Sequence, residues 1–179
     1  MIYYTSDLHF GHYNVLRFDN RPFSTIEEMD NKLIELWNKR VTNEDTVYIV
    51  GDLCYRNKNG ADWYLKQLNG HKILITGNHD SYTLKNQEAM KYIDKTYQIL
   101  SISDKDRRVV MCHYPMTEWE GFYRNAYHVY GHIHNNKNMA FEIMKQFDRA
   151  LNAGCMINNY MPVTLDELIV NNNKFKRKH

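Results

Sequence analysis

The segment Thr46-Val47-Tyr48-Ile49-Val50-Gly51-Asp52 decides the fold class. Five residues that favour strands come in succession, and glycine and aspartate end the run, which is typical of a buried strand that leads into a loop. The same pattern occurs at 2–7 and at 72–78, where the strand-forming runs end at Ser6-Asp7 and Gly77-Asn78. Three such strands predict a buried, largely parallel sheet.

Helices are predicted between these strands. Apolar residues recur at helical spacing from 24 to about 41, and Ser24 with Glu27 has the pattern of a capping box. Further helices are predicted at 61–68 and near 82–92. In folds where strand and helix alternate, ligands bind where loops leave the carboxyl ends of the strands. We therefore expect a functional site in the loops that follow the strands.

The second half of the chain continues the alternation. Strands are predicted at 97–102, 108–112 and 127–130, and a closing helix at 164–170 with Thr164 and Glu167 as its cap. No linker or repeat interrupts residues 1–172, which we expect to form a single domain. Residues 173–179 are expected to be a basic, solvated tail.

Length and charge limit the class of protein. The 179 residues suit one domain, and the formal net charge of +2 comes largely from the basic tail. This balance falls short of that expected for a dedicated nucleic-acid binder. The three cysteines lie far apart and suggest no disulfide framework, and no stretch is apolar enough to span a membrane. We expect a cytoplasmic protein without membrane contact; the sequence does not predict its oligomeric state.

Residues that could bind metal follow five of the predicted strands. They are Asp7-Leu8-His9, Gly51-Asp52, Gly77-Asn78-His79-Asp80, His113 and Gly131-His132-Ile133-His134. Each alone has an ordinary explanation as a turn or as polar residues on one face of a strand. All five together, each at a strand end, favour a common site, because a sheet brings the ends of neighbouring strands together.

The five elements resemble the ordered motifs of the calcineurin-like metallophosphoesterase superfamily, which are Asp-x-His, Gly-Asp, Gly-Asn-His-Asp/Glu, His and Gly-His-x-His. In addition, 151–154 and 162–165 look like the closing strand and helix of its small bacterial and phage members. The resemblance implies the metallo-dependent phosphatase fold. This is an α/β fold (α+β in some schemes), a four-layer α-β-β-α sandwich of two mixed sheets flanked by helices.

The resemblance also implies two divalent metal ions. One would be held by Asp7, His9, Asp52 and His134, and the other by Asp52, Asn78, His113 and His132. Asp52 would bridge them, since a carboxylate has two oxygens to share and the ions of two-metal hydrolases lie ~3.5–4 Å apart. The mixed ligands suit manganese as first choice, and also Fe, Zn, Co or Ni.

The implied reaction is attack of a metal-bridging hydroxide on a phosphodiester or phosphomonoester, with Asp52 and Asn78 in the catalytic centre. His79 is the candidate proton donor to the leaving oxygen. Many members have an aspartate that orients this histidine, whereas this chain has Tyr55 at that position. A phenol does not supply the same negative charge near neutral pH, so the protonation state of His79 is open.

Four residues are candidates for contacts with a small phosphate-ester substrate: Asn78, Arg56, His12 and Arg124. Arg56 occupies the position where the resemblance implies a phosphate clamp, and His12 could contact substrate from the rim of the first metal site. Arg124 lies in the aromatic segment 116–126, which is expected to wall the site and to suit a nucleotide or nucleic-acid end. Arg56 could equally be a solvated surface residue, and His12 a packing residue.

Two alternatives remain from the sequence. A different binuclear hydrolase would show His-x-His at the first strand, where this chain has Asp7-Leu8-His9. A noncatalytic binding module would use the metals as a scaffold that recognises a protein or nucleic-acid partner. Turnover of a chromogenic phosphodiester separates this module from an enzyme.

Overall fold

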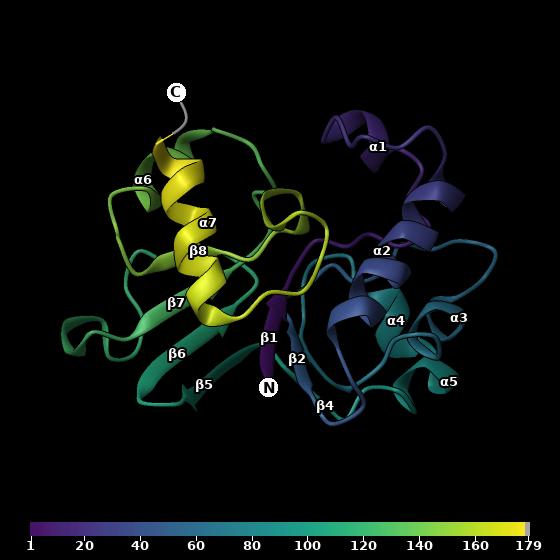
Figure 1. Cartoon of the computed structure of the whole chain (residues 1–179), viewed down its shortest axis with the longest axis horizontal. Coiled ribbons are helices and arrows are strands. Elements are labelled where there is room, and N and C mark those ends of the chain that lie inside the picture. The colour runs from purple at the N-terminus through teal and green to yellow at the C-terminus, as the bar shows by residue number, and fades with distance from the viewer. Residues whose placement is uncertain (178–179) are drawn as a thin grey trace.

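Two four-stranded sheets pack face to face between helices in the computed structural model, which describes residues 1–177 (Figure 1). Three groups of buried side chains separate the layers. One group lies between the two sheets, and the other two lie between each sheet and the helices and loops outside it. The predicted four-layer α-β-β-α sandwich is thereby confirmed.

The first sheet contains β1 (Ile2–Thr5), β2 (Thr46–Ile49), β3 (His71–Ile75) and β4 (Lys95–Tyr97), in that order. All three pairings between these strands are parallel. On the outer edge of β1, an isolated bridge pairs Tyr4 with Val163, and this pairing is antiparallel. The carboxyl ends of β1, β2 and β3 consequently lie at one edge, as the sequence predicts.

The second sheet contains β5 (Ile99–Asp104), β6 (Arg107–Cys112), β7 (Tyr127–Tyr130) and β8 (Ala150–Asn152). The β5–β6 pair is antiparallel, and β6, β7 and β8 are parallel. The single strand predicted at 97–102 is wrong in one respect, because the chain passes from the first sheet to the second at Gln98. Strand periodicity does not show which sheet a strand joins.

The helices are α1 (Val15–Phe18), α2 (Ile26–Arg40), α3 (Ala61–Leu65), α4 (Ser81–Lys85), α5 (Gln87–Met90), α6 (Met139–Met144) and α7 (Leu165–Arg177), with 3₁₀ turns η1 (Phe122–Arg124) and η2 (Cys155–Asn158). The cap of α2 lies one residue beyond the predicted position. Thr25 Oγ1 accepts a hydrogen bond from the Glu28 N–H at 3.1 Å, and the Glu28 carboxylate accepts one from the Ser24 N–H at 2.7 Å. The segment 82–92 forms two short helices instead of one.

Helix α7 begins as predicted, where the Glu167 carboxylate accepts a hydrogen bond from the Thr164 N–H at 2.8 Å. It continues to Arg177, so residues 173–177 are not a solvated tail. The Phe175 ring packs against Phe141 with 5.2 Å between centroids, and the Lys176 ammonium donates to the backbone carbonyls of Phe147 and Ala150. Residues 178–179 of the predicted tail lie outside the described residues.

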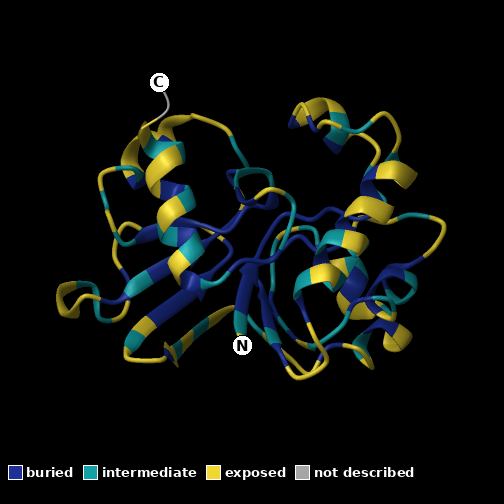
Figure 2. Ribbon diagram, in the orientation of Figure 1, coloured by how far each residue is buried: buried dark blue, intermediate teal, exposed yellow. Residues whose placement is uncertain are grey.

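Burial follows the layers (Figure 2), since most strands are largely buried, whereas β4, much of β5 and the outer faces of α2 and α7 are exposed. The three cysteines are buried and free. Within residues 1–177, no helix combines the length and the apolar character needed to cross a bilayer.

Candidate metal centre

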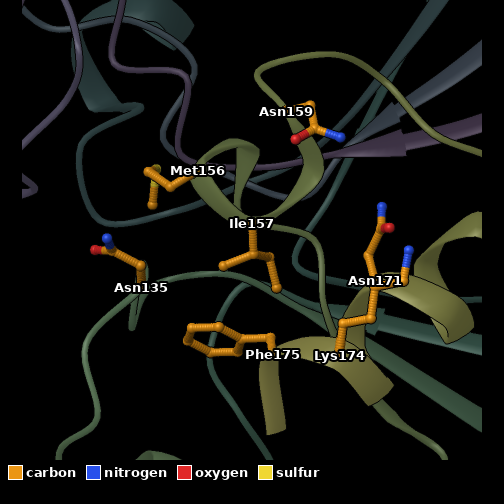
Figure 3. Close-up of a pocket in the computed structure, with 7 residues that line it drawn as sticks. All are labelled: Asn135, Met156, Ile157, Asn159, Asn171, Lys174 and Phe175. Carbon is orange, nitrogen blue, oxygen red and sulfur yellow. The ribbon is translucent and has the colours of Figure 1, made fainter. Parts of the chain in front are cut away.

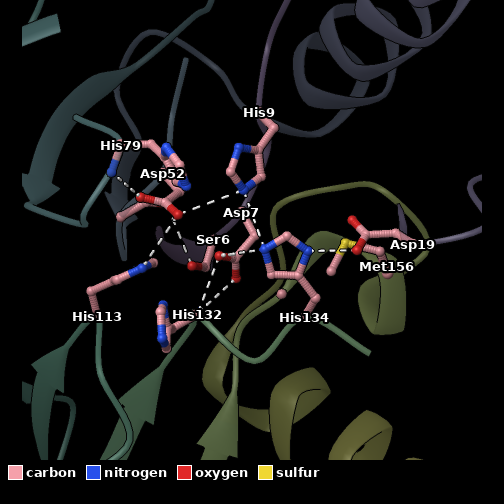
Figure 4. A network of polar contacts seen from close by, with 12 residues as sticks. Ser6, Asp7, His9, Asp19, Asp52, His79, His113, His132, His134 and Met156 are labelled. Atoms are coloured by element: carbon pink, nitrogen blue, oxygen red, sulfur yellow. Dashed lines mark hydrogen bonds and ion pairs between the residues drawn. The ribbon is translucent and has the colours of Figure 1, made fainter. Parts of the chain in front are cut away.

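The seven predicted ligands come from the ends of strands in both sheets, and Figure 4 labels six of them, all but Asn78. Asp7 and His9 follow β1, Asp52 follows β2, Asn78 follows β3, His113 follows β6, and His132 and His134 follow β7. The site therefore lies where the carboxyl edges of the two sheets meet.

Four of these side chains could hold one ion. Asp7, His9, Asp52 and His134 each offer a ligand atom within 4.8 Å of the others. The Nε2 atoms of His9 and His134 are 3.2 Å apart, and His134 Nε2 lies 3.6 Å from Asp7 Oδ1. Ligands at right angles around a metal at about 2.1 Å would be about 3.0 Å apart. The spacing and the donor types thus fit a divalent cation.

A second group forms around Asn78. Its Oδ1 lies 3.2 Å from His113 Nε2 and 3.0 Å from His132 Nδ1. Asp52 Oδ2 lies 3.4 Å from His113 Nε2 and 3.6 Å from His9 Nε2. One carboxylate oxygen therefore faces both groups, which is the position that a bridging ligand requires.

The backbone at the site is unusual. Asp7, His9, Asp52, His132 and His134 have φ values of 56°, 53°, 55°, 70° and 53°, in the left-handed region. Side chains other than glycine rarely adopt this conformation, and such residues cluster at functional sites. Half of the non-glycine residues with positive φ in the described chain are thus predicted ligands.

Two glycines allow the strand ends to approach closely. A Cβ atom at Gly51 would lie 2.1 Å from His113 Nδ1, and one at Gly131 would lie 1.9 Å from Ser6 Oγ. Gly51 also has a φ of 87°. Because any larger residue would push His113 away, the Gly-Asp motif is needed for packing as well as for the turn.

Asp7, His9, Asp52 and His113 are buried, and their pKa values reflect this. Burial raises the pKa of Asp7 and lowers that of His9 to about 2. Burial also acts on Asp52 and His113, but their hydrogen bond and opposite charges outweigh it, so the pKa of Asp52 falls to about 2 and that of His113 rises to about 9. Without bound metal, Asp52 and His113 compensate each other's charge. Bound cations would compensate the carboxylates of Asp7 and Asp52.

Asp19 and Arg21 support the first group, and the sequence did not identify them. Asp19 Oδ1 lies 2.7 Å from His134 Nδ1, which fixes the ring so that Nε2 points to the other ligands. The Arg21 guanidinium donates to Asp19 at 3.0 Å and to the Asp7 carbonyl at 2.8 Å. Both residues lie in the irregular loop after α1, away from any strand end, so periodicity gives no signal for them.

Asp80 organises two of the motifs. Its buried carboxylate accepts hydrogen bonds from the backbone N–H groups of Asp52, Leu53 and Gly77 at 2.9, 2.9 and 2.7 Å. It thereby ties the Gly-Asp loop to the Gly-Asn-His-Asp loop. The sequence marked Asp80 as part of a motif, but the structure reveals what it holds.

His79 and His12 lie at the rim of the site. The backbone N–H of His79 donates to Asp52 Oδ1 at 2.9 Å, and its ring lies 5.4 Å from that of His9. The Tyr55 ring stacks on His12 at 4.0 Å and is 5.8 Å from His79. Arg56 is exposed and has no hydrogen-bond or ionic partner among residues 1–177.

Arg124 is not brought to the metal centre. It ends η1 and precedes β7, whereas His132 follows the carboxyl end of that strand. Arg124 instead lines a cavity with Arg107 and Arg149, which lie at the amino ends of β6 and β8. The segment 116–126 folds over the second sheet, and Trp119 is buried there. The prediction that Arg124 contacts substrate therefore has no support from this arrangement.

A cavity of about 420 Å³ opens next to the His134 loop (Figure 3). It is lined by Asn135, Met156, Ile157, Asn159, Asn171, Lys174 and Phe175. Asn135 directly follows the candidate ligand His134, and Met156 Sδ lies 3.3 Å from an Arg21 nitrogen. The cavity thus adjoins the first group of ligands and offers amides, one ammonium and an aromatic ring.

Comparisons with known proteins agree with this geometry. A family model described as calcineurin-like phosphoesterase matches residues 1–103. An uncharacterized protein of Methanocaldococcus jannaschii is 33% identical over 171 residues, which covers 94% of this chain and 89% of the archaeal protein. The chain belongs to the calcineurin-like phosphoesterase family.

Other relatives of this phosphoesterase include the gene 66 protein of Mycobacterium phage L5, 33% identical over 100 residues, or 54% of this chain and 48% of the phage protein. The crystal structure of a protein of unknown function from Aquifex aeolicus has a TM-score of 0.72 at 27% identity, covering 93% of this chain and 96% of that one. The family model ends before His113, His132 and His134. These three histidines are therefore assigned to the candidate centre by their positions alone.

Proposed function

We propose that the chain is a binuclear metal-dependent phosphoesterase. The observation that carries the proposal is the position of Asp52 Oδ2, 3.6 Å from His9 Nε2 and 3.4 Å from His113 Nε2. A single-metal site would need only three or four ligands. Seven converging ligands with a shared carboxylate suit two ions, with manganese as the first candidate.

Some residues of the site would bind the cations or the phosphate, and others would hold these residues in position. Two bound cations would supply an activated water oxygen and neutralise the negative charge of the phosphate. Asp52 and Asn78 hold the middle of the site, and Asn78 is exposed, so its amide N–H₂ is free to donate to a phosphate oxygen. Asp19 and Asp80 keep the ligands in place, which limits reorganisation during the reaction.

His79 is proposed to protonate or to stabilise the leaving oxygen. Its backbone is fixed by Asp52 while its ring is partly exposed at the rim. Tyr55 stacks on His12 and places no charge beside His79, so the histidine acts without an orienting carboxylate. His12 and Arg56 are proposed to contact the phosphate from the same side, Arg56 through its planar guanidinium.

The substrate class is proposed to be a nucleotide-type phosphate ester. The support is the cavity beside His134, where asparagine amides could bond to the edge of a base and Phe175 could stack on its face. Lys174 would pair with a further phosphate group. These features replace the contacts that the sequence assigned to Arg124.

Hydrolysis of bis(p-nitrophenyl) phosphate and of a panel of nucleotides by Mn²⁺-loaded protein tests this function. We expect turnover by the wild type, and for Asp52→Asn we expect lower occupancy at both metal positions together with loss of turnover. Asp62→Asn, on the outer helix α3, serves as the control. Loss of only one ion from Asp52→Asn would show that the bridge is wrong. Inactivity of the loaded wild type across metals and esters would favour a binding module.

A further inference from the structure

A second cavity lies at the opposite end of the second sheet from the metal centre. Its volume is about 860 Å³, within the ~300–1,000 Å³ range of small-molecule sites. Five arginines line it: Arg107, Arg108, Arg124, Arg149 and Arg177. We call it the arginine cavity.

Strand polarity separates this cavity from the metal centre. Arg107 begins β6 and Arg149 precedes β8, whereas His113 follows the carboxyl end of β6. A six-residue strand is roughly 20 Å long, so a ligand in the arginine cavity would not reach the metal ligands. Ile169, Asn173 and Arg177 recur every four residues on α7 and close one side of the cavity.

Three of the five guanidinium groups lack a carboxylate partner. Arg107 pairs with Asp166, and Arg108 pairs with Glu120 at 2.9 Å. Among residues 1–177, Arg124, Arg149 and Arg177 have no such partner. These three side chains line one concave surface and none of them is held in an ion pair, so their positive charges are available to an incoming anion.

Two of the arginines are also incompletely hydrogen bonded. The Nε atoms of Arg107 and Arg149 are buried and have no acceptor among the described residues. Within residues 1–177, the Arg149 side chain makes one hydrogen bond, in which Nη2 donates to the Phe122 carbonyl at 3.5 Å. Because a partly desolvated guanidinium gains strongly from a neighbouring anion, these two residues favour an occupant with phosphate oxygens.

The surrounding acidic groups limit the size of that occupant. Asp106 and Asp148 line the same cavity and are exposed, and the carboxylates of Asp166 and Glu120 lie beside it. The positive charge is therefore confined to the cavity and does not extend into a track along the surface. This pattern suits a compact oligoanion better than the backbone of a long nucleic acid.

We propose that the arginine cavity binds a compact ligand that carries at least two phosphate groups. Arg124, Arg149 and Arg177 contact the phosphates, and planar guanidinium groups allow bidentate contacts. This site does not depend on metal at the catalytic centre, and its existence is independent of the proposed hydrolysis.

Amide NMR spectra of the ¹⁵N-labelled full chain, loaded with diamagnetic Mg²⁺ and titrated with inorganic pyrophosphate, test the proposal. We expect saturable shifts at 106–108, 124–127 and 148–149, and much weaker binding of inorganic phosphate. Arg124→Gln and Arg177→Gln, which are exposed and make no internal ion pair, should each weaken the binding about tenfold or more. The variant Lys39→Gln/Lys66→Gln, with exposed charges on the first sheet's side, should bind as the wild type does.

The same titration of Asp52→Asn separates the two proposals, because pyrophosphate should still shift the cavity amides when the metal centre is impaired. Shifts confined to the loops of His113 and His132 would overturn the proposal, as would unchanged affinity in both arginine variants. Equal affinity for phosphate and pyrophosphate would refute the requirement for two phosphates. Tighter binding of dodecathymidylate, with shifts spreading beyond the cavity, would indicate a nucleic-acid surface instead.

Discussion

Single buried carboxylates determine how well the metal ligands are held. Asp80 is the best example, because one side chain accepts hydrogen bonds from the backbone of Asp52, Leu53 and Gly77. Asp19 has a similar role toward His134. Neither residue is a ligand in the proposed centre, yet each orients a loop or a ring that supplies one.

Replacing Asp80 by asparagine should therefore affect both stability and metal content. The amide group presents an N–H₂ to backbone N–H donors, so at least one donor loses its acceptor, at a cost of about 1–3 kcal/mol. Urea unfolding and elemental analysis measure the two effects. Asp106→Asn, at an exposed position, is the control. An Asp80→Asn protein as stable as this control would contradict the role given to Asp80.

His79→Ala should retain both metals and hydrolyse esters more slowly. If His79 protonates the leaving oxygen, the loss should be about 10²–10⁴-fold for esters with poor leaving groups and much smaller for p-nitrophenyl esters. Rates across a series of leaving groups measure this difference. An equal loss for all leaving groups would indicate a role in binding, not in proton transfer.

Three residues that support the site show the limit of sequence patterns. The convergence of the seven candidate ligands could be predicted because each follows a strand, and strand ends are recognised from local runs of apolar residues. Asp19, Arg21 and Asp80 act through contacts between distant segments, such as the 2.7 Å contact from Asp19 to His134. No local spacing encodes these contacts, nor the position of Arg124 at the amino end of β7, away from the candidate metal centre.

Helix α7 shows how an element can extend beyond its predicted end. The predicted helix stopped at Val170, because Asn171, Asn172 and Asn173 have a weak helix preference. In the structure the buried Asn172 accepts from the Asn152 N–H at 2.7 Å and donates to the Asn152 carbonyl at 3.0 Å. Tertiary contacts to β8 thus override the local preference, and the helix continues to Arg177.

Phe175→Ala should consequently destabilise the fold. The half-buried ring packs against Phe141, and its removal should cost about 1–2 kcal/mol. The neighbouring exposed Lys174→Ala should change the free energy of unfolding by less than about 0.5 kcal/mol. Chemical unfolding of both variants measures the difference. Equal stability of the two would support the solvated tail that the sequence suggested.

The contact between α2 and the loop after β1 should depend on pH. Burial raises the pKa of Asp30 to about 6 from an ordinary value of 3.8, although its carboxylate accepts hydrogen bonds from the Gly11 N–H and the Tyr64 hydroxyl. The folded protein binds this proton more tightly than the unfolded chain does. Stability should therefore fall as pH rises from about 4 to 6, by about 2–3 kcal/mol for this group.

Asp30→Asn removes this titration. The difference in the free energy of unfolding between the variant and the wild type should thus change across pH 4–6, with the variant gaining relative stability as pH rises. Urea unfolding of both proteins at several pH values measures it. Parallel stability curves would show that Asp30 does not titrate in this range.

Across the whole molecule, the proposed centre links two sheets whose facing surfaces form a largely apolar core. Four of the ligands follow strands of the first sheet and three follow strands of the second. The two-layer arrangement could be predicted only through the family resemblance. The passage of the chain from one sheet to the other at Gln98 could not be predicted, because long-range packing decides which sheet a strand joins.

Metal binding should for this reason stabilise the whole fold. Ions that bind only the folded protein add about 2.7 kcal/mol at a concentration of 100 times the dissociation constant. Thermal unfolding at increasing Mn²⁺ concentration should show a rising midpoint for the wild type and a much smaller rise for Asp52→Asn. A midpoint independent of Mn²⁺ in the wild type would contradict a cation site between the sheets.

The left-handed backbone at five of the ligands has an evolutionary consequence. Each such position costs about 1–2 kcal/mol relative to an ordinary conformation, and together they approach the net stability of a typical domain. Glycine at these positions would relieve most of that cost and abolish ion capture. Stability alone would therefore favour glycine at these five positions, and the aspartates and histidines found there are what the proposed ion binding requires.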